Sequence, residues 1–267
     1  MIRAMRQMKS YVLLSAICSL LAVVGCSVKE NRSECPCRLN LDLSNVCMEP
    51  SDSLLLMIDS QTEYTYSSIL GKDSLRGDYV VDVPRISLRL MAWCGGEGMV
   101  SRDGLIIPIG RSCPKIYNYV ADIDADAESV HDTLVMRKNH CVVDIDFKYG
   151  SGDDLTLTVL GNVCGYDVVG TPLMGEFLAT AISLEDDKDA LRQIVLPRQR
   201  GGELTLKVDG TEGLIKSFPL SDYIAATGYD WTSPDLNDIL LTIDVVHTTV
   251  SLSVSGWDEE FFFDVVI

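Results

Sequence analysis

The sequence predicts an all-β protein built of two antiparallel β-sandwich domains. Short runs of alternating apolar and polar residues recur along the chain, and clusters of Gly, Pro, Asn and Asp separate them. The 3.6-residue period of amphipathic helices is almost absent. With 267 residues, of which 47% are hydrophobic, the chain can build one large core or two of ordinary size.

Residues 1–25 have the pattern of an export signal. Arg3, Arg6 and Lys9 precede the apolar run YVLLSAICSLLAVV, and the small Gly25 follows that run. A helix needs about 20 apolar residues to cross the hydrocarbon core of a bilayer, and this run is shorter. We therefore expect a signal peptide that is removed, and not a permanent membrane span.

Cys26 is the expected site of lipid attachment. Val23-Val24-Gly25-Cys26 resembles the bacterial lipobox, in which the Cys receives diacylglycerol before cleavage and becomes the first residue of the mature chain. Each buried methylene contributes about 0.8 kcal/mol, so several acyl chains hold a protein stably on a membrane. Ser27, in place of Asp, fits delivery to the outer membrane. The alternative is a plain signal peptide with an ordinary Cys26.

Residues 26–34 are predicted to form a tether, since the eight residues SVKENRSE that follow Cys26 are polar and span at most about 28 Å. The first sandwich is assigned to residues 35–150. Its first strand, CRLNLDLS, alternates so that Cys37, Leu39, Leu41 and Leu43 share one face. Further strands of this domain are expected at 53–59, 78–83, 86–94, 104–109, 133–138 and 141–149.

The polar, Gly-rich break KYGSGDD separates this domain from a second sandwich at residues 151–267. Its expected strands are 154–164, 177–184, 192–197, 202–210, 213–220, 238–257 and 261–267. Short helices are expected in 220–231 and 233–240, the latter with Ser233 as N-cap and Pro234 at the first helical position. The closing run FFFDVVI has high β-propensity, so it is either an ordinary paired strand or a strand donated to a partner sheet.

Seven cysteines remain after the signal is removed and Cys26 is lipidated: Cys35, Cys37, Cys47, Cys94, Cys113, Cys141 and Cys164. An odd number leaves at least one unpaired, and their spacing does not define a connectivity. Cys35-Pro36-Cys37 has neither the C-x-x-C spacing of redox sites nor a second pair for a metal. We expect mainly buried thiols, with one or two disulfides as an open alternative.

No catalytic or metal-binding constellation is visible. His131, His140 and His247 flank predicted strands without a ligand partner nearby, so we interpret them as surface or rim residues. The run Asp122, Asp124, Asp126 and Glu128 resembles the start of a calcium loop, but Ala127 replaces the required Gly and Thr133 the required Glu. A solvated acidic loop is the preferred interpretation. We predict no enzyme activity, no cofactor and no metal site.

The charge of the chain excludes several partners. It carries 39 acidic and 22 basic residues, a formal net charge of −17. Three of the basic residues belong to the signal, so the chain after Cys26 carries 19 − 39 = −20. A body this acidic repels the phosphates of nucleic acids and of anionic membrane surfaces. We therefore expect no nucleic-acid partner.

Several motifs together resemble the fimbrillin-associated anchor lipoproteins, the FimB-like and minor-fimbrium anchor family. These are the lipobox Cys26, the short polar tether, ECPCRLNLDLS, DYVVDVPRISLRLMAWCGG with Trp93, HDTLVMRKNHCVVDIDF, LSDYI and LSVSGW. The resemblance implies two transthyretin-like sandwiches, lipid attachment to the outer membrane and a place at the fimbrial base. It also implies fimbrial shaft or accessory subunits as partners, joined by strand complementation. Cys26 is the one residue to which it gives a chemical role.

Two alternative functions remain open from the sequence. One is a lipid-anchored, surface glycan-binding protein, a class that usually stacks sugars on exposed aromatic side chains. Trp93, Trp231 and Trp257 are scattered singly and form no obvious platform in the sequence. The other is a fimbrial tip or accessory subunit, which would be expected to lose its lipidated N-terminus on assembly.

Overall fold

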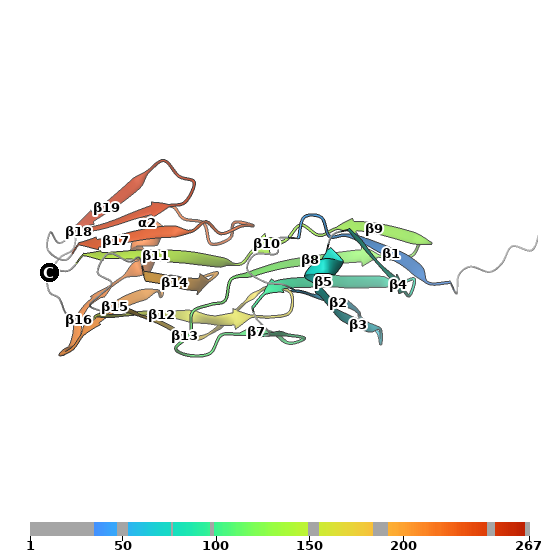
Figure 1. The fold of residues 1–267 in the computed structure, drawn as a ribbon, viewed down its shortest axis with the longest axis horizontal. Helices are drawn as coiled ribbons and strands as arrows, with labels where there is room; N and C mark the ends of the chain where they lie inside the picture. The colour runs from blue at the N-terminus through green and yellow to red at the C-terminus, as the bar shows by residue number, and fades with distance from the viewer. Residues whose placement is uncertain are drawn as a thin grey trace, which may run out of the picture. The chain divides into compact units, whose positions relative to one another are not determined.

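The computed structural model describes residues 35–46, 53–75, 77–96, 99–148, 155–183, 192–244 and 249–264. The predicted export signal, Cys26 and the predicted tether lie outside these ranges. Residues Cys37–Ile267 form a compact unit that is mostly β, as the sequence predicts (Figure 1). Its described part contains one α-helix, α2 (Leu220–Ala226), and one 3-10 helix, η2 (Lys72–Leu75).

Two sheets come from the first half of the chain. The three-stranded sheet has the order β4-β1-β9, with β1 (Cys37–Asp42), β4 (Asp78–Val83) and β9 (Ser129–Thr133). The five-stranded sheet has the order β10-β8-β5-β2-β3, with β2 (Ser53–Ser60), β3 (Thr65–Gly71), β5 (Ser87–Gly95), β8 (Ile116–Asp124) and β10 (Arg137–Lys138). Their inner faces share a core that includes Leu39, Leu41, Leu56, Ile58, Leu88 and Leu90.

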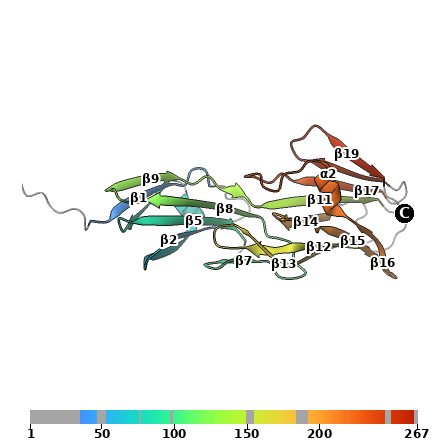
Figure 2. The ribbon, with the colours of Figure 1, turned by 180° about the vertical axis from the view of Figure 1, so that it is seen from behind.

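Two further sheets complete the unit, seen from the opposite side in Figure 2. One has the order β14-β11-β17-β18-β19, with β11 (His140–Lys148), β14 (Arg192–Pro197), β17 (Ile239–Asp244), β18 (Thr249–Val254) and β19 (Glu260–Asp264). The other has the order β16-β15-β12-β7-β6, with β13 also paired to β12. Its strands are β6 (Val100–Ser101), β7 (Gly104–Ile106), β12 (Leu155–Tyr166), β13 (Pro172–Ser183), β15 (Thr205–Gly210) and β16 (Gly213–Phe218).

The alternation in the first strand is confirmed. Cys37, Leu39 and Leu41 are fully buried, whereas Arg38 is exposed. β1 lies between two partners, antiparallel to β4 and parallel to β9. Burial of each Leu side chain contributes about 2 kcal/mol, so this central strand is held both by its apolar face and by backbone hydrogen bonds on both edges.

Two strand pairings differ from the predicted all-antiparallel arrangement. β1 pairs with β9 in parallel, and β11 pairs with β17 in parallel. Each of these pairs joins segments about 90 residues apart in the sequence. An alternating pattern identifies a strand and its buried face but carries no information on strand direction, which explains the error.

The continuous strand predicted at 133–138 is wrong: it overlaps β9 only at Thr133 and β10 only at Arg137 and Lys138. β9 ends at Thr133, and β10 begins at Arg137 in the other sheet. Between them Leu134 is buried in the core, and its amide donates to the carbonyl of Asp42 at 3.0 Å. The strands β3 and β8 were not predicted, because β3 is a polar edge strand and the end of β8 belongs to the acidic run.

Of the two expected helices, only the first forms. α2 contributes the buried Leu220 and Ile224 to the second core. The helix expected at 233–240 is wrong. Arg198 hydrogen-bonds the carbonyl oxygens of Ser233 and Pro234, and the amide of Leu236 donates to the carbonyl of Lys138. These tertiary bonds take backbone groups that a helix would pair internally.

The sheets mix strands from both sides of residue 150. β7 and β11 precede that residue, yet they pair with β12 and β17, which follow it, and β6 joins the same sheet as β12 through β7. The second core also extends to Met57, Met91 and Trp93, which lie on the side of the first five-stranded sheet opposite its own core. The division into domains at 35–150 and 151–267 therefore stays a prediction.

Candidate assembly surfaces

The structure begins where the predicted tether ends. Cys26, the one residue with an expected chemical role, lies outside the described residues. Cys35 is exposed and Cys37 is fully buried as the first residue of β1. The chain therefore passes from an exposed position into a central strand within two residues.

No disulfide joins the six described cysteines to one another. Cys35 is exposed and Cys164 half-buried, and the others are buried: Cys37, Cys94, Cys113 and Cys141. Burial raises the pKa of Cys141 to about 12 and raises that of Cys113 further. The prediction of buried thiols is thus confirmed, and no disulfide joins these six residues. Such protonated cysteines act as small hydrophobic side chains.

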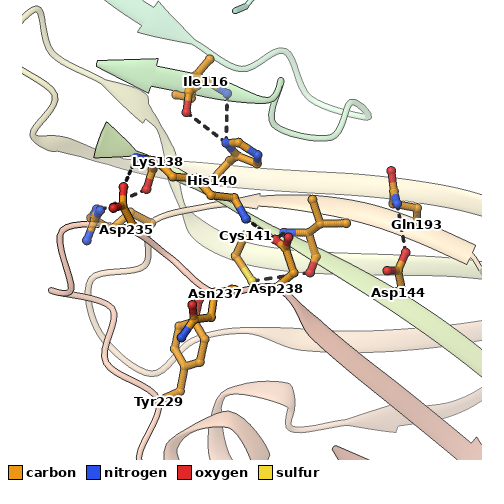
Figure 3. A network of polar contacts seen from close by, with 12 residues as sticks. Ile116, Lys138, His140, Cys141, Asp144, Gln193, Tyr229, Asp235, Asn237 and Asp238 are labelled. Atoms are coloured by element: carbon orange, nitrogen blue, oxygen red, sulfur yellow. Dashed lines mark hydrogen bonds and ion pairs between the residues drawn. The ribbon is translucent and has the colours of Figure 1, made fainter. Parts of the chain in front are cut away.

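One histidine contradicts its predicted position. His131 is exposed, as expected, and His247 lies outside the described residues. His140, however, is almost completely buried, with Nδ1 3.1 Å from the amide nitrogen and 3.0 Å from the carbonyl oxygen of Ile116 (Figure 3). Burial lowers the pKa of His140 to about 4. The sequence predicts a surface position because His140 stands at the end of a strand. The local sequence contains no information on the contact with Ile116 of β8 that buries it.

The acidic run is an exposed turn. Asp122 and Asp124 end β8, while Asp126 and Glu128 lead to β9 in the other sheet of the pair. Asp122 accepts a hydrogen bond from Nε of Arg89 at 2.8 Å, which lowers its pKa. Among the described residues, no three His, Cys, Asp or Glu side chains are arranged to hold a metal ion.

A polar network surrounds the point where β10 leads into β11 (Figure 3). Nζ of Lys138 lies 2.6 Å from Oδ1 of Asp238, and the Lys138 amide donates to Oδ1 of Asp235 at 2.7 Å. Oδ1 of Asp238 also accepts from the amide of Val142 at 2.8 Å. These charged side chains are engaged with one another and with the backbone, which is the pattern of a structural network rather than of a reactive site.

Arg198 is the centre of a second part of this network. Its Nε donates to Oδ1 of Asn139 at 3.0 Å, and its Nη1 donates to the carbonyl oxygens of Trp231 and Ser233, each at 2.6 Å. Nη2 donates to the carbonyl of Pro234 at 3.2 Å. A planar guanidinium with several fixed donors is suited to such a role, and Lys cannot replace it.

Aromatic residues also lie where the first five-stranded sheet meets the two sheets that contain β11 and β12. We call this region the junction. The Tyr166 hydroxyl donates to the carbonyl of Asn139 and accepts from the amide of Arg198, both at 2.5 Å. Trp93, which is 1% exposed, donates from Nε1 to the carbonyl of Val168 at 3.0 Å. The motif that ends in Trp93 is therefore part of this junction and not a ligand-binding platform.

The C-terminal strand β19 is the clearest candidate surface for a partner. It pairs with β18 and forms the edge of its sheet. Phe263 packs inward, with its ring 4.9 Å from that of Tyr223, whereas Phe262 is 72% exposed. Residues 261–264 of FFFDVVI are thus paired within the fold, and 265–267 lie outside the described residues. An edge strand offers backbone donors and acceptors to a further strand.

The other tryptophans do not form a sugar-stacking platform in the part of the chain that the structure describes. The ring of Trp231 lies 4.8 Å from that of Tyr229 and is half-buried, and Trp257 lies at the rim beside Phe261, with ring centroids 6.4 Å apart.

No helix within the described ranges is long and apolar enough to span a membrane.

Among known proteins, similarity is found in the fold and not in the sequence. The sequence matches no protein-family model and no curated protein sequence. The fold is similar to that of a proposed polysaccharide-binding protein from Bacteroides thetaiotaomicron, with a TM-score of 0.63 and 13% identity over 86% of this chain and 98% of that one. It is also similar to a proposed adhesin from Bacteroides ovatus, with a TM-score of 0.54 and 9% identity over 85% and 95%.

The fimbrial anchor protein Mfa2 from Porphyromonas gingivalis has a similar fold as well. Its TM-score is 0.53 and the identity 14%, over 84% of this chain and 98% of that one. The chain therefore has the fold of a group of bacterial adhesin-like and fimbrial proteins. The resemblance to fimbrial anchor proteins that the sequence predicts is confirmed at the level of the fold.

Proposed function

We propose that this protein is a fimbrial anchor or accessory subunit, tethered to the outer membrane through lipidated Cys26 and exposed at the cell surface. Its two halves act as transthyretin-like sandwiches that bind a fimbrial shaft or accessory subunit and carry out no catalysis. The observation that supports this most directly is the fold shared with Mfa2 across 98% of that anchor protein. The lipobox resemblance supplies the point of attachment.

The position of β1 supports a tethering role. Tension on the lipid reaches the fold through the tether at Cys37, the start of β1. That strand is paired on both edges and has fully buried Cys37, Leu39 and Leu41 on one face. To pull β1 out, both sets of hydrogen bonds and the apolar contacts must break together. An anchor requires a connection of this kind between its lipid and its folded domain, because the connection must resist force.

The exposed edge of β19 is where we place the contact with a shaft or accessory subunit. A strand from the partner can continue the sheet beyond β19 through backbone hydrogen bonds, and Phe262 offers it an apolar side chain. Donation of residues 265–267 to the partner sheet is the alternative form of the same contact.

The anchoring role is tested by Cys26→Ala in cells that assemble fimbriae. We expect the variant protein and its fimbriae in the medium, because the chain lacks the acyl chains that hold it on the membrane. The measurement is membrane fractionation with a fatty-acid label. Cys35→Ala is the matched control, since Cys35 is an exposed thiol nine positions further on, and it should stay in the outer membrane. Retention of Cys26→Ala in the outer membrane would overturn the proposal.

A tip subunit and a glycan-binding protein are the alternatives. Acylated Cys26 on the protein within assembled fimbriae favours the anchor over a tip subunit that loses its N-terminus. The glycan-binding alternative is favoured by the similarity in fold to the proposed polysaccharide-binding protein from B. thetaiotaomicron. The isolated positions of the three tryptophans do not favour it.

A further inference from the structure

A groove of about 350 Å³ lies on the first five-stranded sheet, beside the turn that carries Val168 and Val169. Its polar lining includes Asp59, Gln61, Arg89 and Asp122, and its apolar lining includes Met91 and Val169. We call it the β5 groove. Its volume lies within the range of small-ligand sites, which is about 300–1,000 Å³.

Three charged residues form a row along one side of this groove. In the strand register Asp59 of β2 is opposite Arg89 of β5, and Arg89 is opposite Asp122 of β8. Nε of Arg89 donates to Oδ1 of Asp122 at 2.8 Å, and both side chains are exposed to solvent. The half-buried Asp59 carboxylate makes no side-chain hydrogen bond or ion pair with any residue that the structure describes.

A preorganised turn forms the opposite wall. Residues 167–171 connect β12 to β13, and Oδ1 of Asp167 accepts from the amides of Val169 and Thr171 at 3.0 and 2.8 Å. The hydrogen bond from Trp93 to the carbonyl of Val168 fixes the turn to the sheet. Gly170 has φ +84°, and a Cβ there would overlap the Asn118 side chain, so this close approach requires glycine.

We propose that the β5 groove binds a neutral saccharide. The carboxylates of Asp59 and Asp122 accept hydrogen bonds from adjacent sugar hydroxyls, and the remaining donors of Arg89 and the Gln61 amide bond to sugar oxygens. The half-buried Val168 and Val169 contact the C–H face of the sugar ring. A rigid wall reduces the ordering cost on binding.

The charges in the groove select against other ligands. Two carboxylates against one guanidinium, on a chain of net charge −17, disfavour phosphate, sulfate and uronic acids. A cationic peptide is the competing ligand, because it would pair with the same carboxylates. Sugar hydroxyls both donate and accept hydrogen bonds, so a saccharide site needs donors as well as acceptors. Arg89 and Gln61 supply the donors beside the carboxylates of Asp59 and Asp122.

The test is binding of the full chain, in a detergent without a sugar head group, to an array of neutral, uronic-acid and sulfated oligosaccharides. Calorimetry then measures the affinity for the best neutral glycan. We expect neutral glycans alone to bind, and Asp59→Asn and Arg89→Ala each to weaken binding by about tenfold or more, since each removes a hydrogen-bonding partner. Asp82→Asn on β4 is the charge-matched control, because Asp82 is exposed in the other sheet, and its affinity should be unchanged.

Three outcomes would overturn this inference: binding of no neutral glycan, binding that Asp59→Asn leaves unchanged, and binding of oligolysine in place of glycans with loss in the same variant. A circular dichroism spectrum and unfolding curve of each variant show whether it is folded. The groove does not depend on the anchoring proposal, because its variants should leave the outer-membrane location of the protein intact.

Discussion

At the scale of single residues, the structure separates side chains that hold the fold from those that face outward. His140 and Arg198 are engaged with the backbone of segments far away in the sequence, whereas His131 and Arg200 are exposed. His140 lies beside the amide and carbonyl of Ile116, and its burial, which lowers the pKa, favours the neutral imidazole.

His140 should make stability depend on pH between about 4 and 6.5. Burial lowers its pKa to about 4 from the ordinary 6.5, so in this window the unfolded chain binds a proton that the folded chain does not. The free energy of unfolding should therefore fall as the pH drops through this window, by at most about 3 kcal/mol, and this effect should be absent above it.

Urea unfolding of the wild type and of His140→Gln from pH 7.5 to 4 measures this effect, because carboxylates titrate in both proteins and cancel in the difference. We expect the stability advantage of the wild type to shrink as the pH falls. His131→Gln is the control and should follow the wild type in parallel. A difference between wild type and His140→Gln that is independent of pH would contradict the assignment.

At the scale of elements, β1 and β19 occupy opposite kinds of position. β1 is a central strand with partners on both edges, and β19 is an edge strand with β18 on one side. Consecutive residues of a strand point to opposite faces, so the three phenylalanines of β19 cannot all be buried in one core. Phe263 faces Tyr223 inside, and Phe262 faces outward.

Because Phe263 faces the core and Phe262 faces solvent, substitutions at these two positions of β19 should have different effects. Phe263→Ala should lower the free energy of unfolding by about 2 kcal/mol, since it removes packed apolar surface, and Phe262→Lys should change it by less than about 0.5 kcal/mol. Phe262→Lys should nevertheless reduce co-purification with the shaft subunit, because a charge on an edge strand opposes further pairing. Urea unfolding and affinity purification from cells measure the two effects.

Deletion of residues 261–267 extends this test and should abolish co-purification while membrane attachment persists. Val80→Lys on the edge strand β4 is the control, because Val80 is also exposed. If Val80→Lys reduces co-purification and Phe262→Lys does not, the partner surface lies on the three-stranded sheet instead.

At the scale of the whole molecule, a chain with nine cysteines is stabilised by packing and backbone pairing rather than by cross-links among the described thiols. Its two cores are lined by Leu, Ile, Val and a few large aromatic side chains, and the cysteines fill positions among them. Cys141 and Cys94 lie within strands at positions where the alternation calls for an apolar residue.

The thiols should be distinguishable by their reactivity. In the native protein iodoacetamide should label Cys35 first, whereas the four buried cysteines should react only after unfolding, because they are inaccessible and burial raises their thiol pKa where a shift is resolved. Mass spectrometry of alkylated peptides measures this order. Dithiothreitol should leave the thermal midpoint unchanged, and Cys35→Ser is the control that removes the fast site. A midpoint that falls by several degrees on reduction would show a cross-link.

The sequence by itself determined the β class, the inner faces of the strands and the resemblance to fimbrial anchor proteins. Alternation is a property of neighbouring residues, so Cys37, Leu39 and Leu41 could be assigned to a buried face without knowledge of the partner strands. The turn residues between runs, and the helix at 220–226, follow from similarly local preferences.

Only the tertiary structure decided which strands pair and in which direction, where His140 lies, and that Arg198 prevents a helix at 233–240. The row of Asp59, Arg89 and Asp122 likewise exists only because β2, β5 and β8 are neighbours in one sheet. These features depend on contacts between segments many tens of residues apart. Local sequence patterns carry no record of such contacts, because the free energy that selects them comes from packing of the complete chain.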